Sequence, residues 1–121
     1  MGDLSKNLSK REFACKCGCG FDATDMRLVR LLQQCVDALG DTIIITSGCR
    51  CVGYNRKIGG AVNSQHIFGV AADFKIYKDG KQVLPGDVAD WLEDNADRCG
   101  IGRYKSWVHL DTRGSNARWS A

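Results

Sequence analysis

The chain has 121 residues, 44% of them hydrophobic, and a single proline, which fits one globular domain and excludes a disordered tail. Its 17 Lys and Arg and 14 Asp and Glu give a net charge of +3 with no concentrated basic run, so the sequence does not support nucleic-acid binding. No apolar run approaches the roughly 20 residues that span a bilayer, and the amino terminus lacks the apolar core that a signal peptide needs. We therefore expect a single domain over 1–121, synthesised into a cytoplasm and without a membrane span.

The first half of the chain predicts two helices and a strand. Ser9 and Glu12 have the spacing of a capping box, which predicts a short helix at this point. Apolar residues recur at helical spacing over 26–39, and Gly40 supplies the stop. The segment 42–46 is short, β-branched and continuous, which is typical of a buried strand.

The second half predicts strands with one helix inserted among them. The elements that we expect are a short helix at 54–60, strands at 70–77, 82–84, 100–104 and 107–112, a hairpin turn at 78–81, and a helix from 85 to about 98. Helices that precede a mostly antiparallel sheet, with one helix inserted, place the chain in the α+β class.

Seven cysteines are many for this length, and their odd number excludes a complete internal disulfide framework. Cys15, Cys17 and Cys19 form one cluster, and Cys49 and Cys51 form a second. Thiolates grouped in this way can hold a structural metal ion. The alternatives are a disulfide between the two clusters or free thiols. The candidates for a second, structural zinc ion or for a disulfide are Cys15, Cys17, Cys19 and Cys51.

The histidines carry the most specific chemical signal. His66 precedes Asp73 by seven residues with Gly69 between them, and the only other histidine, His109, lies in a later strand-like segment. Because side chains alternate along a strand, pairing the strands of Asp73 and His109 would bring the two together over the sheet, where His66 could close the site. Two imidazoles and a carboxylate make a three-ligand zinc site with a position left for water, which is a hydrolytic centre. The alternative is three ordinary polar residues.

These residues resemble the zinc D-alanyl-D-alanine carboxypeptidase family, which includes D-Ala-D-Ala dipeptidases and phage endolysin peptidases. The family signature Ser-x-His-x-x-Gly-x-Ala-x-Asp is matched at every fixed position from Ser64 to Asp73, and the zinc histidine of the second family motif corresponds to His109. The resemblance implies a hedgehog/D-Ala-D-Ala peptidase-like fold, with helices on one side of the sheet and the zinc site over it. It also implies one catalytic Zn²⁺ on His66, Asp73 and His109.

The activity that the resemblance implies is hydrolysis of an amide bond in the stem peptides of bacterial peptidoglycan, as a carboxypeptidase or an endopeptidase. The short chain favours a monomeric phage or prophage lysin, which would act at the cell wall after release or as a component of the virion. The mildly basic charge would help association with an anionic wall polymer.

The resemblance also suggests substrate-binding residues. Arg50 occupies the place of the family arginine that orients a substrate carboxylate or stabilises the developing oxyanion, and a guanidinium suits both tasks. The alternative for Arg50 is a surface ion pair. Ser64, Asn55 and Tyr104 are the other expected substrate contacts.

One position departs from the family pattern. Many members carry a Glu or Asp three residues before the last zinc histidine as general base, and here that position is Ser106. Asp111, on the same strand face as His109, is the nearest carboxylate, and we expect it to act as the base. It could instead hold an imidazole. If neither works, the chain is an inactive zinc-bound protein that binds cell wall or serves in a virion.

Overall fold

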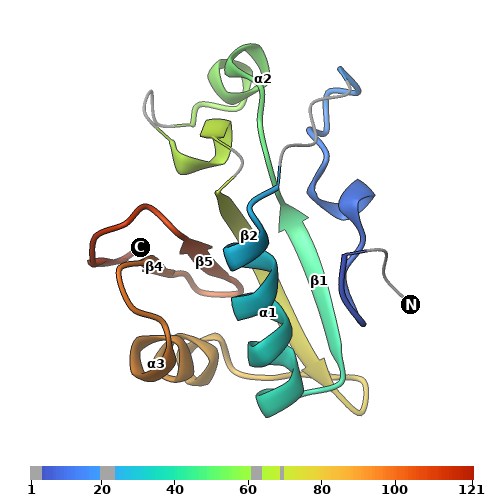
Figure 1. Ribbon diagram of the computed structural model, residues 1–121, viewed down its shortest axis with the longest axis vertical. Helices are drawn as coiled ribbons and strands as arrows, with labels where there is room; N and C mark the ends of the chain where they lie inside the picture. Colours follow the sequence, from blue (N-terminus) through green and yellow to red (C-terminus); the bar gives the residue numbers. More distant parts are fainter. Residues whose placement is uncertain (1–3, 20–23, 61–63, 69) are drawn as a thin grey trace.

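A six-stranded sheet organises the part of the chain that the computed structural model describes, which is residues 4–19, 24–60, 64–68 and 70–121 (Figure 1). The strands are β1 (Thr42–Ser47), β2 (Ala71–Lys78), β3 (Lys81–Gln82), β4 (Gly100–Arg103), β5 (Val108–Asp111) and β6 (Ala117–Ser120). Their order is β1-β2-β5-β4-β6, and β3 pairs with one end of β2. Only the pairing of β4 with β6 is parallel, so the predicted α+β class with a mostly antiparallel sheet is confirmed.

Helices and short 3-10 turns make up the other described elements. They are α1 (Met26–Leu39), α2 (Val52–Lys57), α3 (Pro85–Asn95) and the turns Lys10–Phe13 and Gln65–Phe68. The helix predicted over 26–39 is confirmed, whereas α2 begins two residues before the predicted start at 54 and α3 ends before the predicted 98. In the described residues, no helix combines the length and apolarity that a membrane span requires.

Gly40 ends α1 as predicted, but through close packing and not through a left-handed backbone. Its φ is −161°, which any residue adopts, and its N–H still donates to the carbonyl of Val36. A Cβ on Gly40 would lie 2.3 Å from the carbonyl oxygen of Tyr77 in β2. The glycine therefore allows the chain to pass directly against the sheet where it turns from α1 into β1.

The helices α1 and α3 cover one face of the sheet, as expected (Figure 1). Alternate residues of β2 and β5 point into the core beneath them, and the same face of β4 contributes Ile101. The core residues of these two strands are Ala72, Phe74, Ile76, Val108 and Leu110, all at most 1% exposed. The residues between them therefore point to the opposite face, which no α-helix of Figure 1 covers.

The hairpin turn predicted at 78–81 is confirmed between β2 and β3. Asp79 and Gly80 both have positive φ, at 51° and 79°, which is the requirement of the two-residue turns that follow the twist of a hairpin. Lys78 pairs with Lys81 across the turn.

The strand β6 was not predicted. Ala117–Ser120 alternates between half-buried and exposed positions and carries no run of β-branched residues, so its sequence has no strand pattern. It pairs with β4 because Trp119 packs over Gly102, where a Cβ would lie 2.6 Å from the indole nitrogen. The strand thus depends on a contact between distant segments, which the local sequence pattern does not predict.

Candidate metal centre

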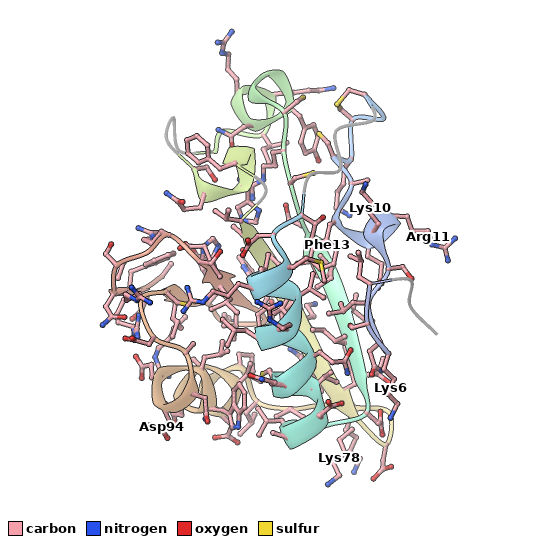
Figure 2. All side chains as sticks on the ribbon, viewed as in Figure 1. Lys6, Lys10, Arg11, Phe13, Lys78 and Asp94 are labelled. Atoms are coloured by element: carbon pink, nitrogen blue, oxygen red, sulfur yellow. The ribbon has the colours of Figure 1, made fainter. Side chains whose placement is uncertain are left out.

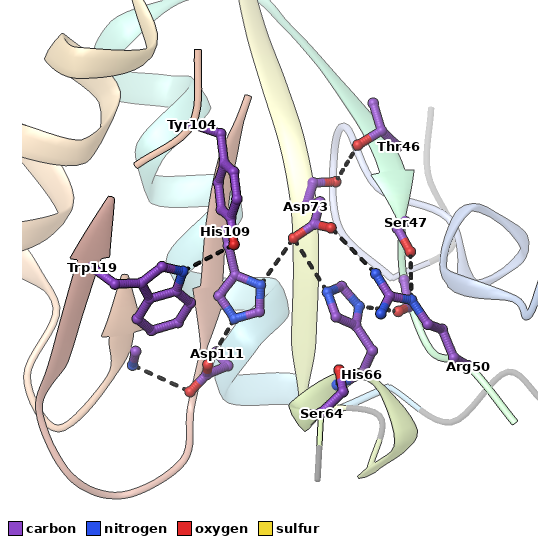
Figure 3. A network of polar contacts seen from close by, with 12 residues as sticks. Thr46, Ser47, Arg50, Ser64, His66, Asp73, Tyr104, His109, Asp111 and Trp119 are labelled. Carbon is purple, nitrogen blue, oxygen red and sulfur yellow. Dashed lines mark hydrogen bonds and ion pairs between the residues drawn. The ribbon is translucent and has the colours of Figure 1, made fainter. Parts of the chain in front are cut away.

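His66, Asp73 and His109 converge on the face of the sheet opposite the helices (Figure 3). Asp73 Oδ1 lies 3.2 Å from His66 Nε2 and 2.9 Å from His109 Nδ1. Donors at 2.0–2.2 Å from a tetrahedral zinc ion lie roughly 3.3 Å from one another. The three side chains therefore have both the chemistry and the spacing of a zinc ligand set.

The sheet register places two of these side chains. Asp73 in β2 and His109 in β5 are directly opposed in the antiparallel pairing, as the alternation of side chains predicted. His66 comes from the 3-10 turn Gln65–Phe68 that precedes β2. Gly69, expected to let the chain turn between ligand and strand, lies outside the described residues.

The second nitrogen of each imidazole is held by the protein. His66 Nδ1 lies 2.5 Å from the carbonyl oxygen of Gly48, and His109 Nε2 lies 2.7 Å from Asp111 Oδ2. A carbonyl and a carboxylate only accept, so these two ring nitrogens carry the protons. In the neutral rings, His66 Nε2 and His109 Nδ1 would then each have a lone pair for a metal ion, which is the tautomer that a metal ligand needs. Without a metal ion, a second proton on either ring lets the same nitrogen donate to Asp73 Oδ1.

The site stabilises a carboxylate at Asp73. Burial alone would raise the pKa of Asp73, but hydrogen bonds and charge from His109 and His66 outweigh it and hold that pKa well below its ordinary value. Burial conversely lowers the pKa of His109, whereas its bonds to Asp111 and Asp73 raise it, and the net direction is upward. A metal ion at this position therefore competes with a proton for His109.

Asp111 lies behind His109, on the side of the ring away from Asp73 (Figure 3). Its side chain is fully buried, and Arg113 donates three hydrogen bonds to it, from its backbone N–H at 3.2 Å, from Nε at 2.8 Å and from Nη2 at 2.7 Å. Gly100 makes room, because a Cβ there would lie 2.4 Å from Asp111 Oδ2. This is the geometry of the imidazole-holding alternative, and Asp111 is not among the residues that line the cavity beside the site.

The protonation behaviour of Asp111 agrees with that placement. Burial raises its pKa, but hydrogen bonds from Arg113 and His109 outweigh burial and lower the pKa well below its usual value. A general base at neutral pH works best with a pKa near the operating pH. Ser106, at the usual position of the family base, is exposed, and its carbonyl accepts a hydrogen bond from Gln82.

A cavity of about 530 Å³ opens beside the three ligands. Three of the four expected substrate contacts, Arg50, Ser64 and Tyr104, line it. The fourth, Asn55, is buried behind Arg50 and accepts a hydrogen bond of 3.1 Å from its Nη1.

Arg50 points into the site and is not a surface ion pair. Its side chain is 12% exposed, its Nη2 lies 3.5 Å from Asp73 Oδ2, and its Nε donates to Ser47 Oγ at 3.2 Å. Its backbone N–H donates to the carbonyl of His66 at 2.9 Å. Gly60 allows this packing, since a Cβ there would lie 2.1 Å from the Asn55 side-chain oxygen.

Ser64 and Tyr104 make further contacts at the cavity wall. Ser64 Oγ accepts a hydrogen bond from the N–H of His66 at 3.2 Å, which fixes the turn that carries this histidine. The Tyr104 hydroxyl accepts from Trp119 Nε1 at 2.9 Å, and the Tyr104 ring stacks on Trp107 with a centroid distance of 4.6 Å.

The sequence did not identify every residue of the cavity wall as a candidate. Arg113 lines the cavity while it holds Asp111, and it was not a candidate. Trp119 also lines the cavity and packs on the His109 ring, with a centroid distance of 5.0 Å. The signal for Arg113 was its place two residues after Asp111, just beyond the strand that carries His109.

The four candidate thiols also come together, away from the cavity lining. The Sγ atoms of Cys15, Cys17 and Cys51 lie 3.5–3.8 Å apart, and Cys19 belongs to the same group. Cys49, which the sequence placed beside Cys51, is buried outside this group. None of the seven cysteines, all of them in described residues, forms a disulfide.

Comparison with known proteins adds one match. The sequence model of the peptidase M15 family matches residues 6–111, a span that contains all three candidate ligands. No curated protein matches the chain.

Proposed function

The chain belongs to the M15 peptidase family, and we propose that it is a zinc-dependent peptidase of bacterial peptidoglycan that hydrolyses an amide bond of the stem peptides. The observation that carries this proposal is the convergence of His66 Nε2, Asp73 Oδ1 and His109 Nδ1 beside a cavity, with the other nitrogen of each ring held by an acceptor. When bound by these residues, zinc supplies Lewis-acid polarisation of the scissile carbonyl and acidifies a water molecule.

Arg50 orients the substrate. Its guanidinium is fixed by Ser47 and Asn55, and it lines the cavity next to Asp73. A fixed planar fork of N–H donors suits a substrate carboxylate or the oxyanion that develops on a carbonyl. Because the fork is held before the substrate arrives, little side-chain freedom is lost on binding.

The charges of the cavity favour an anionic substrate. Arg50 and Arg113 both line it, and Asp73 is the only carboxylate among the lining residues that the structure describes. A peptide with a free C-terminus carries a carboxylate there. The cavity therefore matches the chemistry of these peptides, and either the carboxypeptidase or the endopeptidase reaction fits it.

We assign Asp111 a positioning role and not that of the base. Its carboxylate is saturated by His109 and Arg113, has a lowered pKa and lies across the imidazole from the Asp73 side of the ring. Its action is to keep the proton of His109 on Nε2, so that Nδ1 stays free for the metal.

A specific observation also favours a second candidate function. Among the described lining residues, no carboxylate other than the ligand Asp73 reaches the cavity, and Ser106 replaces the usual base. An enzyme of this kind needs a group that takes a proton from water. The second candidate is therefore a zinc-bound protein that holds wall peptides without cleaving them, at the cell wall or within a virion.

Wall digestion distinguishes the two functions. The zinc-loaded protein is incubated with peptidoglycan of several wall types, with and without a chelator, and the products are read by mass spectrometry. The peptidase predicts release of stem-peptide fragments that chelator and His66→Ala both abolish and that Lys78→Ala, in the exposed hairpin turn, retains. Zinc-loaded protein that sediments with walls but releases no fragment would instead establish the binding function and refute the peptidase.

A further inference from the structure

Four thiols from two distant segments form a cluster separate from the candidate metal centre. Cys15 and Cys51 are 36 residues apart in the sequence, yet their Sγ atoms lie 3.8 Å apart. Cys17 Sγ lies 3.5 Å from Cys15 Sγ and 3.6 Å from Cys51 Sγ, and the ligand atoms of all four cysteines lie within 4.8 Å of one another. Figure 2 shows sulfur atoms where the N-terminal segment approaches α2.

These distances fit a metal ion and not a disulfide. A disulfide bond is about 2.05 Å long, well short of any separation in the cluster. Four thiolates at about 2.3 Å from a tetrahedral zinc ion have sulfur atoms roughly 3.8 Å apart. The three measured separations of 3.5–3.8 Å lie close to that value.

The backbone offers donors to two of these sulfur atoms. The N–H of Cys51 points to Cys15 Sγ at 3.4 Å, and the N–H of Tyr54 points to Cys51 Sγ at 3.3 Å. Such N–H groups stabilise thiolates and orient them, as the outer contacts of metal ligands do. They come from the start of α2, where Cys51 is the N-cap.

The number of thiols in the cluster also matches a closed metal site, in which the protein fills every coordination position. It contains four of the seven cysteines, which is the full coordination number of structural zinc. The other three cysteines are buried in the protein interior and lie outside the cluster: Cys35, Cys49 and Cys99. A disulfide would use only two of the four clustered thiols.

We propose that Cys15, Cys17, Cys19 and Cys51 bind one zinc ion as a closed tetrathiolate site that ties the N-terminal segment to the start of α2. Its four ligands are separate from His66, Asp73 and His109, and zinc binding there does not require the proposed peptidase activity.

The tetrathiolate site fixes Arg50, which directly precedes Cys51 in the sequence. On the other side of Arg50, the N–H of Cys49 donates to the carbonyl of Phe13 at 2.8 Å, and a Cβ on Gly48 would lie 2.4 Å from Phe13 Cα. The backbone of Arg50 is thus held between a direct contact with the N-terminal segment and the zinc-bound Cys51. The metal would therefore act as a structural support for the guanidinium at the cavity.

The number of zinc ions bound per chain tests the site. It is measured on the full chain, which is purified under reducing conditions and then loaded with zinc. Cys17 and Cys19 are exposed, so the double variant Cys17→Ser/Cys19→Ser disturbs no core packing. It should carry one zinc ion fewer per chain than the wild type, and Lys16→Ser, in the same loop, should lose none. The variant His66→Ala/His109→Ala should lose the other ion and keep the thiolate-to-metal charge-transfer absorption after cobalt substitution, whereas the serine variant should lose that absorption.

Alkylation gives a measurement that needs no variant. In the zinc-loaded wild type, the exposed Cys17 and Cys19 should resist N-ethylmaleimide, and a chelator should make both reactive.

Hydrogen exchange tests the support of Arg50. The backbone amide of Arg50, which donates to the carbonyl of His66, should exchange faster in the variant Cys17→Ser/Cys19→Ser than in the wild type, and the amide of Ile76 in β2 should exchange at the same rate in both. Equal zinc content in the wild type and the serine variant, rapid alkylation of zinc-loaded protein, or recovery of a native disulfide at Cys51 would each overturn the proposal.

Discussion

Replacing Asp111 with asparagine separates the positioning role from the role of a general base. The carboxylate accepts hydrogen bonds from His109 Nε2 at 2.7 Å, from three nitrogens of Arg113 and from the backbone N–H of Gly100. Asparagine has nearly the same shape but offers one oxygen and one NH₂ group. Oδ1 accepts from the N–H of Gly100 and from N and Nε of Arg113, so the asparagine oxygen takes that place and the NH₂ group replaces Oδ2 beside His109 Nε2 and Arg113 Nη2. There the NH₂ group donates to His109 Nε2, which moves the ring proton onto Nδ1, the nitrogen turned toward Asp73.

The expected loss follows from that shift. A proton on His109 Nδ1 blocks a metal ligand, and the removal of such supporting contacts costs about 10–100-fold in metal affinity, or about 1.4–2.7 kcal/mol. We expect zinc affinity at the histidine site of Asp111→Asn to fall by this factor, with cleavage restored in part by excess zinc. Zinc affinity is measured by competition with a chelator of known strength, and Ser106→Ala serves as the control because Ser106 is exposed and away from the cavity lining.

The two roles of Asp111 predict opposite patterns in this assay. A base contributes to the chemical step and not to metal binding, so its removal would lower kcat at saturating zinc and leave zinc affinity unchanged. If Asp111→Asn binds zinc as tightly as the wild type and yet cannot cleave at any zinc concentration, the positioning argument is wrong and the carboxylate acts as the base.

Three further measurements test other parts of the structure. Replacing Arg50 with alanine should lower kcat/KM about 10²–10³-fold, the cost of losing an oxyanion donor, with zinc content unchanged; a loss confined to KM would show that the arginine only binds substrate. The lowered pKa of Asp111 means that its carboxylate stabilises the fold above the ordinary Asp pKa of about 3.9, and that this stability is lost as pH falls through the lower folded-state pKa. Urea unfolding of chelator-treated protein between neutral and acid pH should show that fall, and Asp111→Asn should flatten it; parallel curves would refute the linkage. Replacing Gly102 with alanine puts a Cβ 2.6 Å from the indole nitrogen of Trp119 and should cost about 1–3 kcal/mol by urea unfolding, whereas Gly86→Ala, which meets nothing within 4 Å, should change stability little; equal effects would contradict the packing argument.

The sequence predicts well the elements whose signal is local. The apolar spacing over 26–39, the β-branched segment at 42–46 and the turn through Asp79 and Gly80 all appear where expected. The expectation that 42–46 is a buried strand was wrong, because β1 lies at the edge of the sheet and leaves Ile44 46% exposed. Alternation along strands also predicted that Asp73 and His109 would meet over the sheet. Period and turn chemistry are properties of neighbouring residues, so they can be read before the chain is folded.

The features that were missed depend on contacts between distant segments. Strand alternation puts Asp111 on the same face as His109, but it does not decide which ring nitrogen the carboxylate meets. The ring nitrogen that Asp111 meets is decided by the space above Gly100 and by the hydrogen bonds that Arg113 donates to Asp111. The strand that carries Trp119 likewise exists because the indole packs over a glycine of β4.

The carboxylates around the candidate metal centre are each paired with an arginine, so they would neutralise little of the charge of a bound zinc ion. Asp73 faces Arg50 at 3.5 Å, and Asp111 is bound by the guanidinium of Arg113 through two hydrogen bonds. Each carboxylate is therefore balanced by its own guanidinium, while the two imidazoles would bind a metal ion as neutral rings. The dipositive charge of a bound zinc ion would then have no net compensation from the two carboxylates and two guanidiniums, which would strengthen its pull on a carbonyl oxygen and the attraction of the cavity for a carboxylate-bearing peptide. The same pairing explains why two arginines can line the cavity without excluding a cation, because each guanidinium lies beside a carboxylate.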